Sequence, residues 1–103
     1  MVRTRIKLQY ELEEILGNRR VYFQSPENLK LEYPCIIYNL EGVDNVRADD
    51  QAYLWNKRYF VTIIDRDPDS DIWEKMIRRF EHCSLDRTAV NDNLHHWYMT
   101  LYW

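Results

Sequence analysis

The most informative part of the sequence lies between Ala52 and Asp65 and reads AYLWNKRYFVTIID. Aromatic and β-branched side chains fill most of its positions, which is typical of a β-strand. The stretch is longer than the usual strand of about five or six residues. We therefore predict one long strand here, and we expect part of it to project beyond the sheet as a hairpin arm.

Segments on both sides of this strand predict its neighbours. Upstream, Arg19 to Phe23 ends in Val-Tyr-Phe, and Tyr33 to Leu40 reads YPCIIYNL. Downstream, Asn93 to Trp103 reads NLHHWYMTLYW, which predicts a terminal strand with bulky side chains on both faces. The residues between His82 and Asn93 are interpreted as a connector that holds, at most, a short strand around Cys83 to Leu85.

The N-terminal segment has the periodicity of an amphipathic helix. Leu8, Leu12, Ile15 and Leu16 recur at helical spacing and form one apolar stripe. Gly17 and Asn18 follow at once, and these residue types end helices because they adopt positive φ easily. We predict a helix that ends at Leu16.

A second helix is expected after the turn sequence DRDPDSD, which runs from Asp65 to Asp71. Asp71 and Glu74 have the spacing of a capping pair, and Ser70 is the competing N-cap. Basic residues in the last turn suit the helix dipole. The helix presents a broad apolar face formed by Ile72, Trp73, Met76, Ile77 and Phe80.

The expected element order is helix, strand, strand, strand, helix, strand (α-β-β-β-α-β). Sequential strands with short or irregular connections favour an antiparallel sheet, and amphipathic helices cover one face of such a sheet. We therefore predict an α+β fold, with a mostly antiparallel four-stranded sheet and two helices packed on one face. Residues 1–103 are expected to form a single domain.

Composition narrows the function. The chain has 103 residues and a formal net charge of −3. A protein that follows a phosphate backbone usually carries a strong positive charge, so we expect no sequence-specific nucleic acid partner. No apolar run approaches the roughly 20 residues of a membrane span, and no signal-peptide pattern is visible. We expect a cytoplasmic location, no membrane contact, and reduced thiols at Cys35 and Cys83. The alternative, a disulfide between the two, requires that the fold brings their backbones together.

Motifs that carry chemistry are lacking. The sequence has no Gly-rich phosphate loop, Ser nucleophile elbow, paired CxxC motif or HExxH helix. His95 and His96 are neighbours in a predicted strand, so their side chains point to opposite faces, and His82 with Cys83 has the same difficulty. The acidic run before the second helix lacks the central Gly and the closing Glu of a calcium loop. We therefore predict a protein that is not an enzyme, with no catalytic residue, cofactor or metal.

The aromatic residues, 8 Tyr, 4 Trp and 3 Phe, are more numerous than a two-layer domain of this size needs. Tyr and Trp are enriched in the cores of protein interfaces. The alternative is that large side chains simply fill a thin core. The candidate interface residues between copies of the chain are Tyr53, Trp55, Tyr59, Trp97, Tyr98 and Tyr102.

Two further segments suggest surface roles. Glu41 to Gln51 reads EGVDNVRADDQ and is interpreted as a long polar loop between the second and third strands. Lys57 and Arg58 lie among aromatic residues, which would suit the stacking of unpaired bases. The predicted strand sends these two basic side chains to opposite faces, so nucleic acid binding is the weaker interpretation.

The stretch from Leu31 to Trp103 resembles small proteins of tailed-phage and prophage morphogenesis clusters of Gram-positive bacteria. The similar motifs are YPCIIY at Tyr33 to Tyr38, KRYFVTIIDRDPDS at Lys57 to Ser70, and DNLHHWYMTLYW at Asp92 to Trp103. With the N-terminal helix, the resemblance covers nearly the whole chain. Its features are those of the tail-terminator and head–tail joining group, small α+β proteins that form rings.

The resemblance implies a structural role. Such a protein would form a ring of copies of itself, commonly a hexamer, that caps the tail tube and contacts the head connector. It would be found in the host cytoplasm during assembly and then in the virion. The acidic segment would face a neighbour or the lumen, through Asp44, Arg47, Asp49 and Asp50, although a solvated loop has the same composition. The alternatives are a monomeric protein-binding or inhibitor module and a binder of single-stranded nucleic acid.

Overall fold

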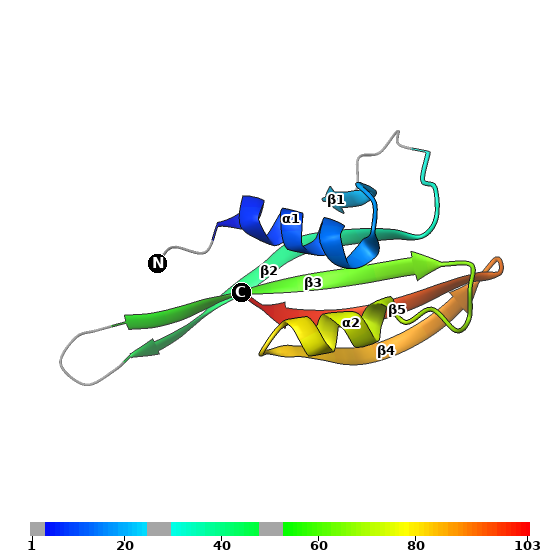
Figure 1. Ribbon diagram of the computed structural model, residues 1–103. Coiled ribbons are helices and arrows are strands. Elements are labelled where there is room, and N and C mark those ends of the chain that lie inside the picture. The colour runs from blue at the N-terminus through cyan, green and yellow to red at the C-terminus, as the bar shows by residue number, and fades with distance from the viewer. Residues whose placement is uncertain (1–3, 25–29, 48–52) are drawn as a thin grey trace.

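The computed structural model describes residues 4–24, 30–47 and 53–103, without the side chains of residues 44–47 and 53–56. One five-stranded sheet, in the order β1-β2-β3-β5-β4, carries both helices on the same face (Figure 1). The elements are α1 (Arg5–Leu16), β1 (Val21–Phe23), β2 (Cys35–Arg47), β3 (Tyr53–Asp65), α2 (Ile72–Arg79), β4 (Cys83–Asn91) and β5 (Leu94–Tyr102).

The predicted α+β class is confirmed, but the prediction of four strands was wrong. The sheet is mixed, because β1 runs parallel to β2 while all other neighbouring strands are antiparallel. The additional strand is β4, which occupies Cys83–Asn91 where a connector was expected. A two-residue turn joins it to β5, with Asp92 and Asn93 at φ 51° and 63°. Asp and Asn tolerate this left-handed region, which a tight type I′ hairpin turn requires.

The interpretation of Glu41 to Gln51 as a loop was wrong for residues 41–47, and its remainder lies outside the described residues. Strand β2 continues to Arg47 and pairs with β3, in a register that runs from Gly42 opposite Arg58 to Arg47 opposite Tyr53. A bulge between Leu40 and Gly42 precedes this part. Asp44 and Arg47 therefore lie in a strand, while Asp49 and Asp50 lie outside the described residues. A strand segment that covers no core needs no apolar alternation, which is why its polar sequence resembled a loop.

The hairpin arm predicted from the length of β3 is confirmed. Strand β1 pairs with β2 only at residues 36–38, and β5 pairs with β3 only from Arg58 onwards. Beyond these limits, Val43–Arg47 pairs with Tyr53–Lys57 and with no third strand among residues 4–24, 30–47 and 53–103. This two-stranded part, hereafter the arm, projects from one end of the domain (Figure 1), and the molecule measures 52 × 25 × 22 Å.

The core lies between the helices and one face of the sheet. Ile36, Ile63 and Trp97 are cross-strand neighbours there, and a second row places Val61 beside Met99. The expected stripe of α1 is confirmed, because its members are at most 9% exposed. They are Leu8, Leu12, Ile15 and Leu16. Gly17, at φ 83°, ends the helix as expected.

Helix α2 starts at Ile72, where it was expected, but the predicted capping pair does not form. Asp71 is the N-cap residue and its side chain makes no capping hydrogen bond. Its carboxylate instead lies 3.6 Å from the Nζ of Lys75, one turn further on. In the preceding turn, the Oδ1 of Asp67 accepts a hydrogen bond from the backbone N–H of Asp69, 2.9 Å away. The carboxylates of this acidic run thus stabilise a turn and a helix start.

Adjacent positions of α2 test this assignment of the core. Met76 is fully buried and Ile77 is 40% exposed. We expect Met76→Ala to lower the free energy of unfolding by about 2–5 kcal/mol and Ile77→Ala by less than about 1 kcal/mol, as measured by urea denaturation. Equal losses at the two positions would contradict the packing of α2 described here.

Candidate assembly surfaces

The sheet face opposite the helices carries a cluster of aromatic rings. Among the described residues, no helix covers this open face. The rings of Phe60 and Tyr98 stack with centroids 5.8 Å apart and an angle of 2°, and His96 stacks on Tyr98 at 6.0 Å and 18°. The guanidinium of Arg87 lies 4.5 Å from the ring centroid of Tyr98. These four residues, the ring stack, come from β3, β5 and β4 and are half-buried or exposed.

A polar margin borders the ring stack near β4. The hydroxyl of Thr100 donates to Oδ2 of Asp86 at 2.5 Å, and the hydroxyl of Ser84 donates to Oδ1 of the same carboxylate at 3.2 Å. Apolar rings with a polar, solvent-accessible rim are the usual anatomy of a protein–protein interface. The open face therefore has the chemistry of a docking surface for another protein.

The predicted interface residues are not brought together on one surface. Tyr98 and Tyr102 lie on the open face and are half-buried. Tyr59 and Trp97 lie in the helix-covered core, where 2% and 6% of their surface is exposed. The remaining two, Tyr53 and Trp55, belong to the arm, and their side chains lie outside the described residues.

Sequence analysis did not single out Phe60, His96 or Arg87 as surface residues. Alternation along β5 separates His96 and Tyr98 from Trp97, and this signal was available. The contact of Phe60 with Tyr98 depends on the pairing of β3 with β5, and that of Arg87 on a strand that was not predicted. The ring stack therefore forms because the register of β3, β5 and β4 brings these residues side by side.

The base of the arm is held by described contacts. The Nε of Arg58 lies 3.7 Å from a carboxylate oxygen of Glu41, and its guanidinium lies over Gly42, where an added Cβ would come within 2.7 Å of Nη2. The backbone N–H of Trp103 donates to the carbonyl of Lys57 at 2.8 Å. The arm thus leaves the domain from a fixed base.

Two other parts of the surface could contact a partner: the start of the arm and the outer edge of β4. Leu40 and Val43, at the start of the arm, are each 47% exposed. Strand β4 is the last strand of the sheet, and it has no neighbour on its outer side among the described residues. Every side chain from Asp86 to Asn91 is exposed, and Val90 reaches 64%. An uncovered edge of this kind is a template for pairing with a further strand.

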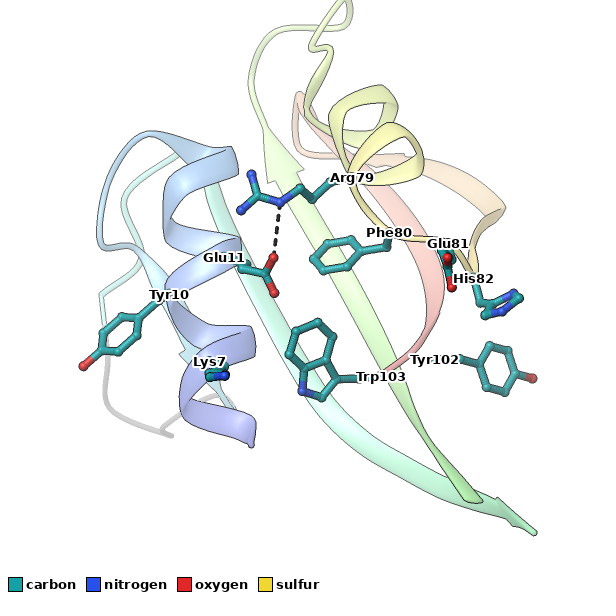
Figure 2. A pocket seen from close by; sticks show the side chains of 9 residues that line it. All are labelled: Lys7, Tyr10, Glu11, Arg79, Phe80, Glu81, His82, Tyr102 and Trp103. Atoms are coloured by element: carbon teal, nitrogen blue, oxygen red, sulfur yellow. Dashed lines mark hydrogen bonds and ion pairs between the residues drawn. The ribbon is translucent and has the colours of Figure 1, made fainter. Parts of the chain in front are cut away.

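A cleft of about 540 Å³ lies between α1, the end of α2 and the C-terminus (Figure 2). Its floor is formed by Phe80 and Trp103, whose rings meet edge to face with centroids 5.9 Å apart. The indole N–H of Trp103 donates to the carbonyl of Thr4 at 3.0 Å, and Arg79 pairs with Glu11 at 3.2 Å. These contacts hold α1 against α2 and the C-terminus. We therefore interpret the cleft as part of the packing between these elements.

The two cysteines are free, as expected. Cys35 lies on β2 and Cys83 on β4, with β3 and β5 between them. Three strand spacings amount to roughly 14 Å, about twice the reach of a disulfide. Burial raises the pKa of the Cys35 thiol to about 11 and that of the Cys83 thiol to about 12. Both thiols stay protonated at neutral pH, which makes them poor nucleophiles.

Possible metal ligands are dispersed. His95 and His96 point to opposite sides of β5, and His96 belongs to the ring stack. Within residues 4–24, 30–47 and 53–103, no group of three or more His, Cys, Asp or Glu side chains has the arrangement of a metal site. Neither described helix is long and apolar enough to cross a membrane.

Comparison with known proteins gives no further guide to function. The chain matches no protein-family model and no curated protein. The resemblance to phage morphogenesis proteins therefore rests on the three sequence motifs.

The buried thiols predict an alkaline limit to stability. Their pKa values lie above the ordinary value of 9.0 in the folded protein, so the unfolded chain loses these protons first as pH rises. Their contribution to stability is complete below pH 9 and is lost as pH rises towards about 12. We expect the free energy of unfolding, from urea titrations, to fall between pH 8 and pH 11 (roughly the range that brackets thiol ionisation).

The Cys35→Ala/Cys83→Ala double variant is the control for this measurement. It should show a shallower decline over the same pH range, with the burial of Tyr38 and Tyr59 contributing the remainder, because their pKa values are also raised by burial. A stability that stays constant or rises as the thiols ionise would count against the burial of these cysteines.

Proposed function

We propose that this protein is a structural component of phage morphogenesis, a ring-forming tail terminator or head–tail joining protein that works by assembling with copies of itself. The single observation that carries the proposal is the arm, a two-stranded extension against which the described part of the chain places no third strand. The resemblance of Leu31 to Trp103 to tail-terminator and head–tail joining proteins supports the same conclusion.

The arm needs a partner for energetic reasons. An isolated two-stranded hairpin is marginally stable in water, because it buries little apolar surface to offset the ordering of its backbone. Among the described contacts, the domain supports the arm at its base, through Glu41 with Arg58 and through the hydrogen bond from Trp103 to the carbonyl of Lys57. A neighbouring subunit would supply the missing contacts.

The open face supports the same proposal. Phe60, Tyr98 and His96 present stacked rings that the fold of the monomer leaves uncovered by any described helix. Arg, Tyr and Trp dominate the energetics of protein interfaces, and stacked rings lose little conformational entropy when they bind. Arg87 over Tyr98 adds a cation that is already oriented.

The contact surfaces of the domain differ from one another. The arm projects from one end, while the free edge of β4 lies along the opposite margin of the sheet from β1. Contacts between unlike surfaces are heterologous, and they generate a closed ring when the rotation between subunits closes. A hexamer is the ring proposed, and its position at the end of the tail tube, against the head connector, follows from the family resemblance.

Self-association in solution is the first consequence. Light scattering on the purified chain, across micromolar concentrations, should give a mass that is an integer multiple of the chain mass, with six copies as the complete ring. A strict monomer over the whole range would overturn self-assembly and would favour the alternative of a monomeric protein-binding or inhibitor module.

Variants of two neighbouring aromatic residues on β5 distinguish a loss of self-association from a loss of folding stability. Tyr98→Ala removes a ring from the open face, and we expect it to weaken self-association at least about tenfold while it lowers the free energy of unfolding by less than about 1 kcal/mol. Trp97→Ala removes a core side chain and should lower the free energy of unfolding by about 3–5 kcal/mol. The measurements are sedimentation velocity and urea denaturation.

A second candidate function draws on the same rings. A sheet with exposed aromatic rings and an arginine resembles the stacking platforms that bind single-stranded nucleic acids. The net charge of −3 opposes the approach of a phosphate backbone. Fluorescence anisotropy with labelled oligonucleotides at low salt distinguishes the two functions: binding that Tyr98→Ala abolishes would favour this candidate, whereas self-assembly without binding favours the first.

A further inference from the structure

We infer that the arm of one copy of this chain adds to the outer edge of β4 of a second copy, which extends the sheet of that copy across the subunit boundary. The inference rests on the proposed self-assembly and identifies the two surfaces that meet. It is argued from the backbone of the arm and from the described residues of β4.

The β2 strand of the arm, Val43–Arg47, has no strand on its outer side among the described residues. On the side of β2, pairing with β1 stops at Tyr38, well before the arm begins at Val43. On the side of β3, pairing with β5 begins only at Arg58, just after the arm ends at Lys57. The β3 side is occupied at the base of the arm, because the carbonyl of Lys57 accepts a hydrogen bond from the backbone N–H of Trp103. The β2 strand of the arm therefore offers the edge of backbone N–H and C=O groups that another strand can pair with.

Strand β4 offers the matching groups. In a two-residue hairpin the residues that flank the turn form a hydrogen-bonded pair, and hydrogen-bonded and non-hydrogen-bonded pairs then alternate. Asn91 and Leu94 flank the turn, so the backbone groups of Val90 and Thr88 point away from β5. The side chains of both residues are exposed and uncharged, so a strand can approach them closely.

The lengths of the two edges agree. A bulge between Leu85 and Arg87 interrupts β4, and bulges bend an edge away from a straight partner. The regular part of the edge is then Arg87–Asn91, which pairs in register with residues 94–98 of β5. It has the same number of residues as the β2 strand of the arm, Val43–Arg47, or roughly 17 Å of strand.

The occupant of the β4 edge is a second copy because this chain itself carries a strand pair that lacks a partner. The two surfaces cannot meet within one molecule, since β5 separates β4 from β3. Strand addition of this kind derives its affinity from main-chain hydrogen bonds. The mixed polar and apolar sequence of the arm, VDNVR and YLWNK, is therefore compatible with its role.

Val90→Pro tests the edge of β4. Proline removes the N–H that points outward and leaves the hydrogen bonds to β5 in place, since proline is tolerated on edge strands with its nitrogen facing solvent. We expect self-association to weaken at least about tenfold. Val90→Thr, which keeps the N–H and the branched shape, is the matched control and should associate like the parent chain.

A shortened chain tests the arm. Residues 43–57 are replaced by Asn-Gly, a turn that suits the direct connection of Gly42 to Arg58, which already pair with each other. This chain lacks the arm and keeps the β4 edge, whereas Val90→Pro lacks the edge and keeps the arm. Alone, each should self-associate at least about tenfold more weakly than the parent chain, with a circular dichroism spectrum and melting transition that report a folded domain.

Mixing the two variants gives the decisive result. One arm and one edge remain competent, so the mixture should form a heterodimer with one copy of each chain and no larger species, as seen by native mass spectrometry. Assembly of the shortened chain or of Val90→Pro at parental strength, or two folded variants that stay monomeric when mixed, would overturn the inference and leave self-assembly standing. A monomeric parent chain would instead overturn the proposed function.

Discussion

Strand β3 has two neighbours along one part of its length and a single neighbour along the other. It pairs with β2 from end to end, but β5 accompanies it only from Arg58 to Asp65. The part with two neighbours is a central strand that buries Tyr59, Val61 and Ile63 under the helices. The part with one neighbour is the arm. The core and the projection are therefore consequences of the same difference in strand length.

Coverage of the sheet is equally one-sided. Helices α1 and α2, of 12 and 8 residues, pack on one face and complete the core there. The opposite face keeps the ring stack of Phe60, His96, Tyr98 and Arg87. A domain of this size can fold with one covered face, and rings of this kind on the other face are better explained by contact with a protein partner than by the stability of the monomer. The proposed assembly would provide that contact.

The sequence correctly predicted the helices and strands whose apolar side chains are buried in the core. The stripe of α1, the apolar face of α2 and the rings of β3 all follow from burial against a common core. Strand β4 and the outer part of β2 were missed because edge and arm strands bury little, so polar residues such as Thr88 and Glu41 carry no alternation to detect. The features that indicate these two strands lie outside them. For β4 the feature is the turn at Asp92 and Asn93, residues that tolerate positive φ, and for the outer part of β2 it is a partner strand, β3, that is long enough to pair with it. Alternation along β5 places Trp97 and Tyr98 on opposite faces of the sheet, but the position of the helices was needed to know that the face of Trp97 and Tyr59 is the buried one.

The most direct test of whether copies of the chain assemble by means of the arm is hydrogen–deuterium exchange of individual amides, measured at low and at high protein concentration. Association should slow exchange in residues 43–47 and 53–57 of the arm together with the amides of Thr88 and Val90, whose N–H groups face away from β5. Core amides such as those of Val61 should exchange slowly at both concentrations. We expect amides of both the arm and the β4 edge to exchange more slowly at the higher protein concentration. Exchange in both segments that is independent of concentration, while the mass of the assembly increases, would contradict it.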